Sequence, residues 1–298
     1  MNRPHPPVSR RNPPKSSSLK APLRSALLAG LAAIAAGCDG GGPTGVESDA
    51  PRVVLSLAPA ELALPAPPAG SEAVRIGFYL TTPHGAEIAR ADAAAAIGST
   101  VAGASEILGA CGLHLAVEGA GVVSVPGRLL TVDGNERGSW GGHPPDSVGD
   151  ADAFMHEQDE RLTAEARELF GSVRAGLPDN AIAAFVVRGI EFWIGEEQEP
   201  AAGLSFAPVI YHAEADYPLR NSVLLRSTAP LPGGSVRRLL AHELGHMLLN
   251  TGTHTGDEDN LMQSGESLTA EQCAVMGENL ARLYGEERVV DPGLPGSS

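Results

Sequence analysis

The chain has 298 residues, of which 21 are Lys or Arg and 36 are Asp or Glu, so its formal net charge at pH 7 is −15. The first 37 positions hold six basic residues and no acid, so the rest of the chain, with 15 basic and 36 acidic residues, has a net charge of −21. Such a charge argues against a nucleic-acid partner and against electrostatic binding to anionic lipid.

Residues 1–37 are typical of a secretory signal peptide. A basic start is followed by the apolar run from Ala26 to Ala36, which is too short to span a bilayer as a stable helix. Small residues then lead directly to Cys38, and this arrangement resembles the lipobox of a bacterial lipoprotein. The resemblance implies cleavage before Cys38, lipid attachment to its thiol and an exported, membrane-anchored protein. Ordinary secretion with a free Cys38 thiol is the alternative.

Residues 38–72 are rich in Gly, Pro and Ala. This composition predicts a flexible tether that contains one short extended segment at 53–55. Residues 73–287 follow as one globular domain of roughly 215 residues, a usual size for a single core. Residues 288–298 are expected to form a disordered tail.

The first elements of this domain predict a βαβ unit. Alternation and β-propensity predict a strand over 73–80, an alanine-rich pattern predicts a helix over 91–108, and a second strand is expected over 113–117. A strand, a helix and a strand at this spacing favour a parallel pair.

The middle of the chain is less regular. Turn-forming residues predict a loop over 134–149, and the acidic run at 196–199 is expected to be a solvated loop as well. A surface helix is expected over 153–169. Three further strands are predicted, over 181–187, 203–206 and 221–225.

The strongest motif lies at 241–250, where the sequence reads A-H-E-L-G-H-M-L-L-N. On a helix, His242 and His246 lie one turn apart on the same face, so two imidazoles can reach one metal ion. Glu243 points about 100° away and can address a water bound to that metal. Apolar residues surround this helix on nearly every side, which predicts that it is buried. Buried polar side chains need partners, and a metal ion satisfies all three, so we predict a metal site here.

The order of elements resembles the metzincin branch of the zincin zinc metalloproteases. In that branch, a twisted mixed sheet is combined with an active-site helix carrying H-E-x-x-H, a turn that contains a methionine, and a C-terminal helix. Here the motif helix is followed by Asn260, Leu261 and Met262, and then by a helix expected over 268–284. The resemblance implies an α+β fold and zinc-dependent peptide-bond hydrolysis, with Met262 as the packing methionine of the turn.

The third metal ligand departs from the family pattern H-E-x-x-H-x-x-G-x-x-H. That pattern would place glycine at 249 and histidine at 252, whereas this chain has Leu249 and Gly252, and its next histidine is His254. A left-handed turn at Gly252 would end the helix and let the chain present His254, which we favour because catalytic zinc sites use three protein ligands. The competing candidates are carboxylates: Asp257 or, as in the gluzincins, Glu266, Glu271 or Glu278.

These residues define a hypothesis for the reaction. Zn²⁺ held by His242, His246 and His254 would lower the pKa of a bound water towards about 7 and polarise the scissile carbonyl. Glu243, as general base, would take the proton of this nucleophilic water and pass it to the leaving amine. By analogy with the family, the strand at 203–206 would be an edge strand that aligns an extended peptide.

Two cysteines remain besides Cys38. Cys111 and Cys273 form an even pair in an exported protein and permit one disulfide, but their spacing does not show whether they meet. A peptide or protein substrate is the expected partner, the membrane is reached only through the lipid on Cys38, and the protein is taken as a monomer. The alternative function is a catalytically inactive metal-binding lipoprotein that binds a peptide or protein partner.

Overall fold

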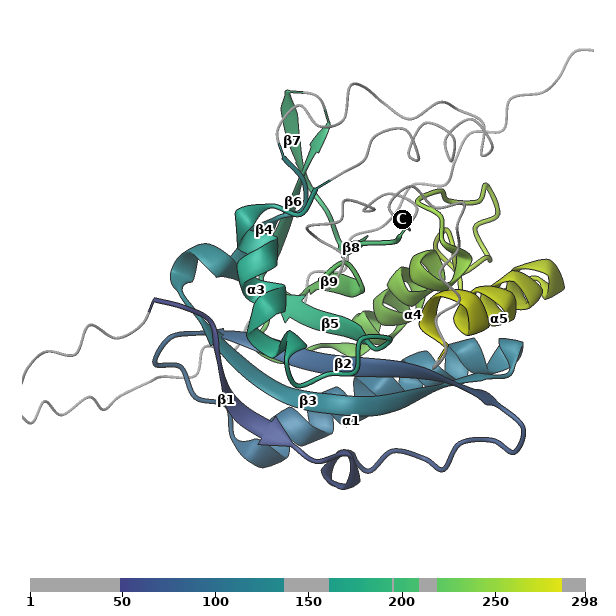
Figure 1. Cartoon of the computed structure of the whole chain (residues 1–298), viewed down its shortest axis with the longest axis horizontal. Helices are drawn as coiled ribbons and strands as arrows, with labels where there is room; N and C mark the ends of the chain where they lie inside the picture. Colours follow the sequence, from purple (N-terminus) through teal and green to yellow (C-terminus); the bar gives the residue numbers. More distant parts are fainter. Residues whose placement is uncertain (1–48, 137–160, 195, 209–218, 286–298) are drawn as a thin grey trace, which may run out of the picture. The chain divides into compact units, whose positions relative to one another are not determined.

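The fold is built on a mixed six-stranded sheet, seen in a computed structural model of the chain (Figure 1). The structure describes residues 49–136, 161–194, 196–208 and 219–285. The strands lie in the order β1, β3, β2, β5, β9, β8 across the sheet. Their bounds are β1 Arg52–Leu57, β2 Glu72–Pro83, β3 Leu113–Val125, β5 Ile182–Val187, β8 Gly203–Ser205 and β9 Ser222–Arg226. Each of the five strands predicted between 73 and 225 is present, although β2 and β3 are longer than predicted.

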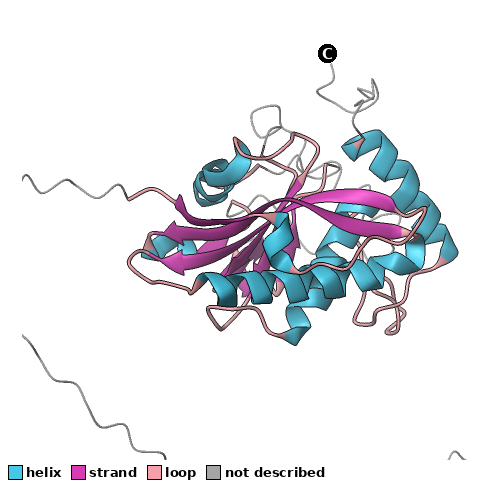
Figure 2. Cartoon of the chain, turned by 90° about the horizontal axis from the view of Figure 1, so that it is seen from below, coloured by secondary structure: helices cyan, strands magenta, loops and turns pink. Residues whose placement is uncertain are grey.

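The centre of the sheet is parallel. Strand β2 pairs in parallel with β3 on one side and with β5 on the other, and β9 continues the parallel order beside β5. Helix α1 (Arg90–Leu108) connects β2 to β3, so the predicted βαβ unit is present. Both edges are antiparallel, with β1 on β3 and β8 on β9. This twisted mixed sheet with its packed helices is consistent with the predicted α+β class (Figure 2).

Helices pack on both faces of the sheet and divide the core into two clusters. Among the described residues, the other α-helices are α3 Ala164–Arg174, α4 Gly234–Leu249 and α5 Ala270–Tyr284. On one face, Phe78 of β2 belongs to the cluster that contains apolar residues of α1, α4 and α5. On the other face, Tyr79 and Phe185 belong to the cluster that contains α3. Strand β2 serves both clusters because successive side chains of a strand point to opposite faces.

Helix α1 is apolar along much of its length. The stretch Arg90–Cys111 is long and apolar enough by composition to cross a membrane. Ten of the helical residues are nevertheless buried within the domain, among them Ile97, Val101 and Leu108. The helix is therefore a core element of the fold.

The sheet begins earlier in the chain than the composition predicts. Residues 52–57 form the edge strand β1, and Pro59–Leu62 form a 3₁₀ helix, η1, although both segments fall inside the predicted tether at 38–72. The compact unit that contains the sheet starts at Ser48, so the domain does not begin at residue 73. The short extended segment predicted at 53–55 lies within β1, which exposes most of its side chains and is held by backbone pairing with β3.

The segment around η1 is anchored in the core. Leu57 and Leu62 are buried in the same cluster as α1. The backbone of η1 approaches α1 at Gly98, where a Cβ atom would lie 2.1 Å from the Leu62 carbonyl oxygen. Only glycine allows this approach without a shift of the backbone.

The middle of the chain contributes a second, three-stranded sheet, which was not predicted. It consists of β4 (Thr131–Asp133), β6 (Gly189–Ile194) and β7 (Glu197–Pro200), with β6 in the middle. The acidic run at 196–199 therefore lies mostly in a strand, and the prediction of a loop there was wrong. The described side chains of β7 are exposed, as a solvated acidic run requires.

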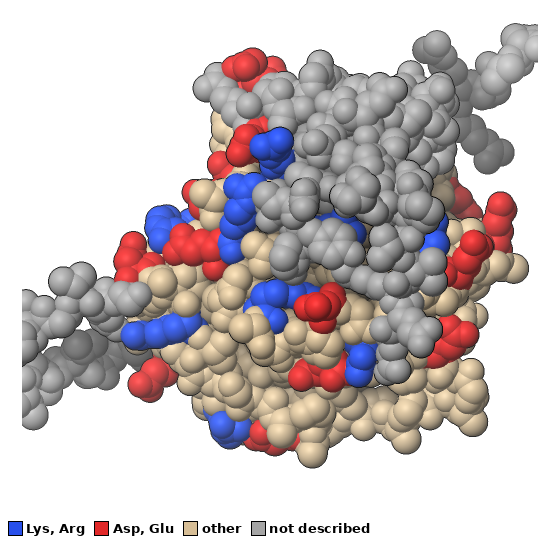
Figure 3. All heavy atoms as spheres, viewed as in Figure 1, with Lys and Arg blue, Asp and Glu red and all other residues tan. Residues whose placement is uncertain are grey.

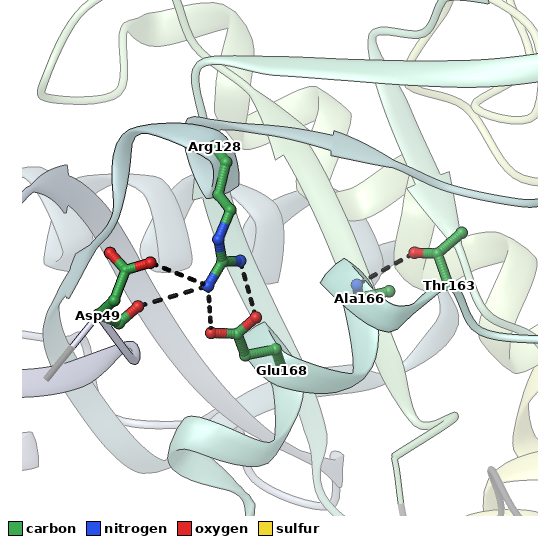
Figure 4. Close-up of polar contacts among 5 residues, drawn as sticks. All are labelled: Asp49, Arg128, Thr163, Ala166 and Glu168. Atoms are coloured by element: carbon green, nitrogen blue, oxygen red, sulfur yellow. Dashed lines mark hydrogen bonds and ion pairs between the residues drawn. The ribbon is translucent and has the colours of Figure 1, made fainter.

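Helix α3 is also placed differently from the prediction of 153–169. It starts after Thr163, whose side-chain oxygen accepts a hydrogen bond from the backbone N–H of Ala166 (3.1 Å), and it ends at Arg174 (Figure 4). Residues 153–160 lie outside the described part of the chain. The capping threonine marks the true start, which a count of apolar and polar residues does not reveal.

Ion pairs hold α3 against the turn before β4. Arg128, in the 3₁₀ helix η3 (Gly127–Leu130), donates hydrogen bonds of 2.7 and 2.8 Å to the two carboxylate oxygens of Glu168 (Figure 4). The guanidinium also lies 3.7 Å from a carboxylate oxygen of Asp49. The pairing with Glu168 raises the pKa of Arg128.

A disulfide joins the end of α1 to the start of α5. Cys111, in the 3₁₀ turn η2 (Gly109–Cys111), is bonded to Cys273, which lies 162 residues later in the chain, and their Cα atoms are 4.8 Å apart. The sequence left this pairing open. A cross-link that closes a loop of this length reduces the conformational freedom of the unfolded chain by an amount worth about 5 kcal/mol in the loop-entropy relation.

We expect Cys273→Ser to lower the free energy of unfolding by about 2 to 5 kcal/mol, because the loop is no longer closed in the unfolded chain. Urea denaturation followed by circular dichroism, without reductant, measures the loss. Reductant should bring the unmodified protein down to the stability of the variant and leave the variant unchanged. Equal stability of the two oxidised samples would contradict a stabilising role for the bond.

Candidate metal centre

The motif helix α4 is buried where its histidines lie. Leu240, Leu244 and Leu248 pack in the core, and the helix ends at Asn250, which adopts a left-handed conformation with φ 51° and ψ 50°. Asparagine tolerates this conformation better than other residues with side chains. The turn that ends the helix is therefore at Asn250, and the prediction that Gly252 provides it was wrong.

Three imidazoles converge beside the C-terminal half of this helix, two from the helix itself and one from the loop that follows. The Nε2 atom of His242 lies 3.2 Å from Nε2 of His246 and 3.2 Å from Nε2 of His254. The ring centroids of the three side chains are 4.8 to 5.1 Å apart. In the described part of the chain, these residues form the group of His, Cys, Asp and Glu side chains close enough to hold a metal ion.

The chain sets the orientation of two of the rings. His242 donates its Nδ1–H to the carbonyl oxygen of Leu261 (2.5 Å), and His246 donates its Nδ1–H to the carbonyl oxygen of Thr251 (2.9 Å). In the neutral imidazole, the Nε2 atom then carries a lone pair. Two such lone pairs 3.2 Å apart repel each other unless a cation or a proton lies between them. The arrangement therefore fits a metal ion, which imidazoles commonly bind in this way with the second ring nitrogen held by a carbonyl.

The electrostatic surroundings keep the three rings in the form that binds metal. Desolvation lowers the pKa of His242 and of His254, although the His254 side chain is exposed, and burial holds the pKa of His246 well below the ordinary histidine value. Repulsion from the neighbouring rings lowers the pKa of His242 and His246 further. The hydrogen bonds to Leu261 and Thr251 act in the opposite direction but are weaker. At pH 7 the rings are neutral, as metal ligation requires.

Glu243 lies beside the cluster and is clamped by the edge strand β8. The hydroxyl of Ser205 lies 2.5 Å from a Glu243 carboxylate oxygen and 2.8 Å from the Glu243 carbonyl oxygen. On the same strand, a Cβ atom on Gly203 would lie 2.2 Å from the other carboxylate oxygen, so any larger residue there would have to displace the Glu243 side chain. Burial raises the pKa of Glu243 to about 7, and the Ser205 hydrogen bond partly offsets this rise. A carboxylate with such a pKa is suited to exchange protons near neutral pH.

Met262 packs beneath the motif helix. Its side chain is buried, and its sulfur would lie 2.5 Å from a Cβ atom placed on Gly245, which sits between the two motif histidines. The glycine thus lets the methionine approach the helix backbone. Met262 lies next to Leu261, whose carbonyl holds His242, so packing and ligand orientation come from one segment.

The carboxylates considered as alternative ligands lie outside the cluster. Asp257 accepts a hydrogen bond from the backbone N–H of Asp259, and Glu266 lies 3.6 Å from a guanidinium nitrogen of Arg237. These two side chains, together with Glu271 and Glu278, are exposed. The structure brings His254 to His242 and His246 and leaves these four carboxylates apart.

Some groups around the site have no signal in the sequence. The carbonyls of Leu261 and Thr251 belong to the backbone, so the residue types at these positions do not predict their hydrogen bonds to the histidines. Ser205 falls within the strand that was predicted at 203–206, but nothing in that strand pattern indicates a bond to Glu243. Cys38, the predicted lipid attachment site, lies outside the described residues.

Comparisons with known proteins give little beyond this geometry. No protein-family model and no curated protein matches the chain. Among solved structures, the chain is similar to the crystal structure of metalloproteinase-II from Bacteroides fragilis, with 15% sequence identity and a TM-score of 0.33. The match covers 72% of this chain and 56% of the other, so the chain spans just over half the length of that protein.

Proposed function

We propose that this protein is a zinc-dependent metalloendopeptidase of metzincin-like architecture. The observation that carries the proposal is the convergence of three neutral imidazoles, two of them on a buried helix, next to a buried carboxylate. Three nitrogen ligands suit Zn²⁺ and leave a fourth position for water or substrate, as in catalytic zinc sites.

In the proposed mechanism, His242, His246 and His254 would hold the metal, and the Leu261 and Thr251 carbonyls keep two of the rings in place. A metal held there would supply Lewis acidity to polarise the scissile carbonyl and to acidify water. Glu243 accepts the proton of the attacking water and then delivers it to the nitrogen of the leaving amine. Ser205 holds the Glu243 carboxylate in reach of this transfer.

The position of strand β8 at the edge of the sheet supports the proposal that the substrate is a peptide. This strand is the last of the six-stranded sheet, so one side of its backbone has no sheet partner among the described residues. An extended peptide can add to such an edge through backbone hydrogen bonds. Because Gly203 and Ser205 of β8 contact Glu243, a peptide on this strand would lie close to the proposed base.

We also propose that the protein is exported and anchored through a lipid on Cys38, with no nucleic-acid partner. The support is the sequence of the signal segment and the acidic composition. On the face seen in Figure 3, acidic and basic side chains are interspersed rather than separated by sign. Mass spectrometry of the membrane fraction should find a lipid-modified Cys38 at the mature N-terminus, and an unmodified Cys38 there would contradict the anchor.

The test of the function combines metal analysis with cleavage of a peptide library. Purified protein should contain about one zinc per chain, and 1,10-phenanthroline should stop cleavage in a way that added zinc restores. Protein that contains stoichiometric zinc but cleaves no peptide would favour the alternative, an inactive metal-binding protein that holds a partner. The buried Glu243 argues against that alternative, because metal binding needs only the histidines and a buried carboxyl group costs free energy.

A further inference from the structure

The side chain of Asn260, in the loop after the motif helix, is hydrogen-bonded through both its oxygen and its nitrogen. This side chain is buried, with 3% exposure. The side-chain oxygen accepts hydrogen bonds from the backbone N–H of Met262 (2.9 Å) and from the amide of Gln272 (3.2 Å). Its amide nitrogen donates to the side-chain oxygen of Gln272 (2.8 Å). These contacts, which we call the Asn260 clasp, join the loop after the motif helix to helix α5.

The clasp holds a three-residue segment that reaches two of the three histidines. Between Asn260 and Met262, the carbonyl of Leu261 accepts the Nδ1–H of His242. The carbonyl of Met262 accepts a hydrogen bond of 3.1 Å from the backbone N–H of Thr255, the residue after His254. One short segment therefore orients a ring on the helix and fixes the backbone beside a ring on the loop.

The clasp is itself attached to a rigid element. The side-chain oxygen of Gln272 also accepts the backbone N–H of Thr269 (2.9 Å), and the Thr269 hydroxyl caps the N-terminus of α5 by accepting the backbone N–H of Gln272. The next residue, Cys273, is cross-linked to Cys111. Because Gln272 is fixed at both its backbone and its side chain, Asn260 is bound to a position that moves little relative to the core.

We propose that Asn260 is a positioning residue of the metal centre, which acts by holding the Leu261 carbonyl against His242 and the Met262 carbonyl against the backbone beside His254. This inference rests on the proposed metal-binding function. A carbonyl that drifts from the His242 ring no longer fixes its orientation, and residues that orient metal ligands typically change metal affinity by about 10- to 100-fold when removed.

The experiment measures zinc affinity of the purified protein by competition with a chromophoric chelator. Asn260→Ala should weaken zinc binding by about tenfold or more. Gln272→Glu keeps the acceptor for Asn260 and Thr269 but loses the donor to Asn260, so it should give a smaller loss. The matched control is Thr163→Ala, which removes the cap of α3 and lowers the stability of the fold but lies outside the clasp and the metal centre. It should bind zinc as tightly as the unmodified protein.

A second measurement separates positioning from general destabilisation. The visible absorption bands of Co²⁺ bound at the site report ligand geometry, and Asn260→Ala should shift them while Thr163→Ala leaves them unchanged. Unchanged affinity and an unchanged cobalt spectrum in folded Asn260→Ala would overturn the proposal, as would an equal loss in Thr163→Ala. If Asn260→Ala does not fold, unchanged zinc affinity in Gln272→Glu would overturn it too. Failure of the unmodified protein to bind zinc at all would instead reject the proposed function.

Discussion

Glu243→Gln should reduce peptide cleavage by roughly 10²- to 10⁴-fold while the protein still binds one zinc. Glutamine has the shape of glutamate and can keep a hydrogen bond from Ser205, so the clamp by β8 is preserved. It cannot take a proton from water, however. Steady-state kinetics should therefore show a fall in kcat with a much smaller change in KM, and metal analysis should show unchanged zinc.

The choice of glutamine matters because of the surroundings of Glu243. The side chain is buried against Gly203, so alanine would leave a cavity and change the packing of the edge strand. Glu258→Gln, a change of the same kind at an exposed loop position, is the matched control and should retain full activity. Cleavage by Glu243→Gln at the unmodified rate would show that another group takes the proton. Loss of zinc in this variant would make Glu243 a structural part of the metal site.

His254→Ala should weaken zinc binding by more than roughly 100-fold. Removing a residue that only orients a ligand can already cost that much, and this variant removes a ligand itself. The two helix histidines would then be the only protein ligands, fewer than catalytic zinc sites use. Chelator competition measures the affinity, and peptide cleavage at limiting zinc should fall in parallel.

Two controls test whether this effect belongs to His254 alone. His114→Ala removes a histidine whose Nδ1 lies 2.9 Å from the Ser71 hydroxyl and that is not part of the cluster, so zinc affinity should not change. Asp257→Ala should also bind zinc normally. If Asp257→Ala loses zinc and His254→Ala keeps it, the carboxylate is the third ligand and the assignment of His254 is wrong.

Local patterns in the sequence predicted the parts of the fold that depend on local periodicity. The βαβ unit of β2, α1 and β3 followed from alternation in the strands and an alanine-rich helix between them. The pair His242 and His246 followed from helical spacing alone. The extended segment predicted at 53–55 is part of β1, but its place in the sheet was missed because it depends on backbone pairing with a distant strand, which local composition does not encode.

Sequence patterns predicted which residues form the candidate site, including His254 and Met262 beyond the motif helix, but not the turn that brings His254 to it. The position of His254 depends on where the helix stops, and the left-handed residue is Asn250 rather than Gly252. Glycine is the usual choice for this conformation, so residue type alone pointed to the wrong turn. Ser205 contacts Glu243, which lies 38 residues away in the chain, and Asn260 contacts Gln272, which lies 12 residues away. No local pattern predicts such pairs.

The Cys111–Cys273 bond affects how damage to this protein would be seen. Both His242 and His246, and the whole of strands β5 to β9, lie between the two bonded cysteines. A peptide bond cut anywhere in this interval leaves two pieces that stay covalently joined. If the protein cleaves itself, the nicked chain will run at full size on a non-reducing gel, and the fragments will separate only after reduction. Comparing the two gels therefore reveals self-cleavage that size-exclusion chromatography under non-reducing conditions would hide.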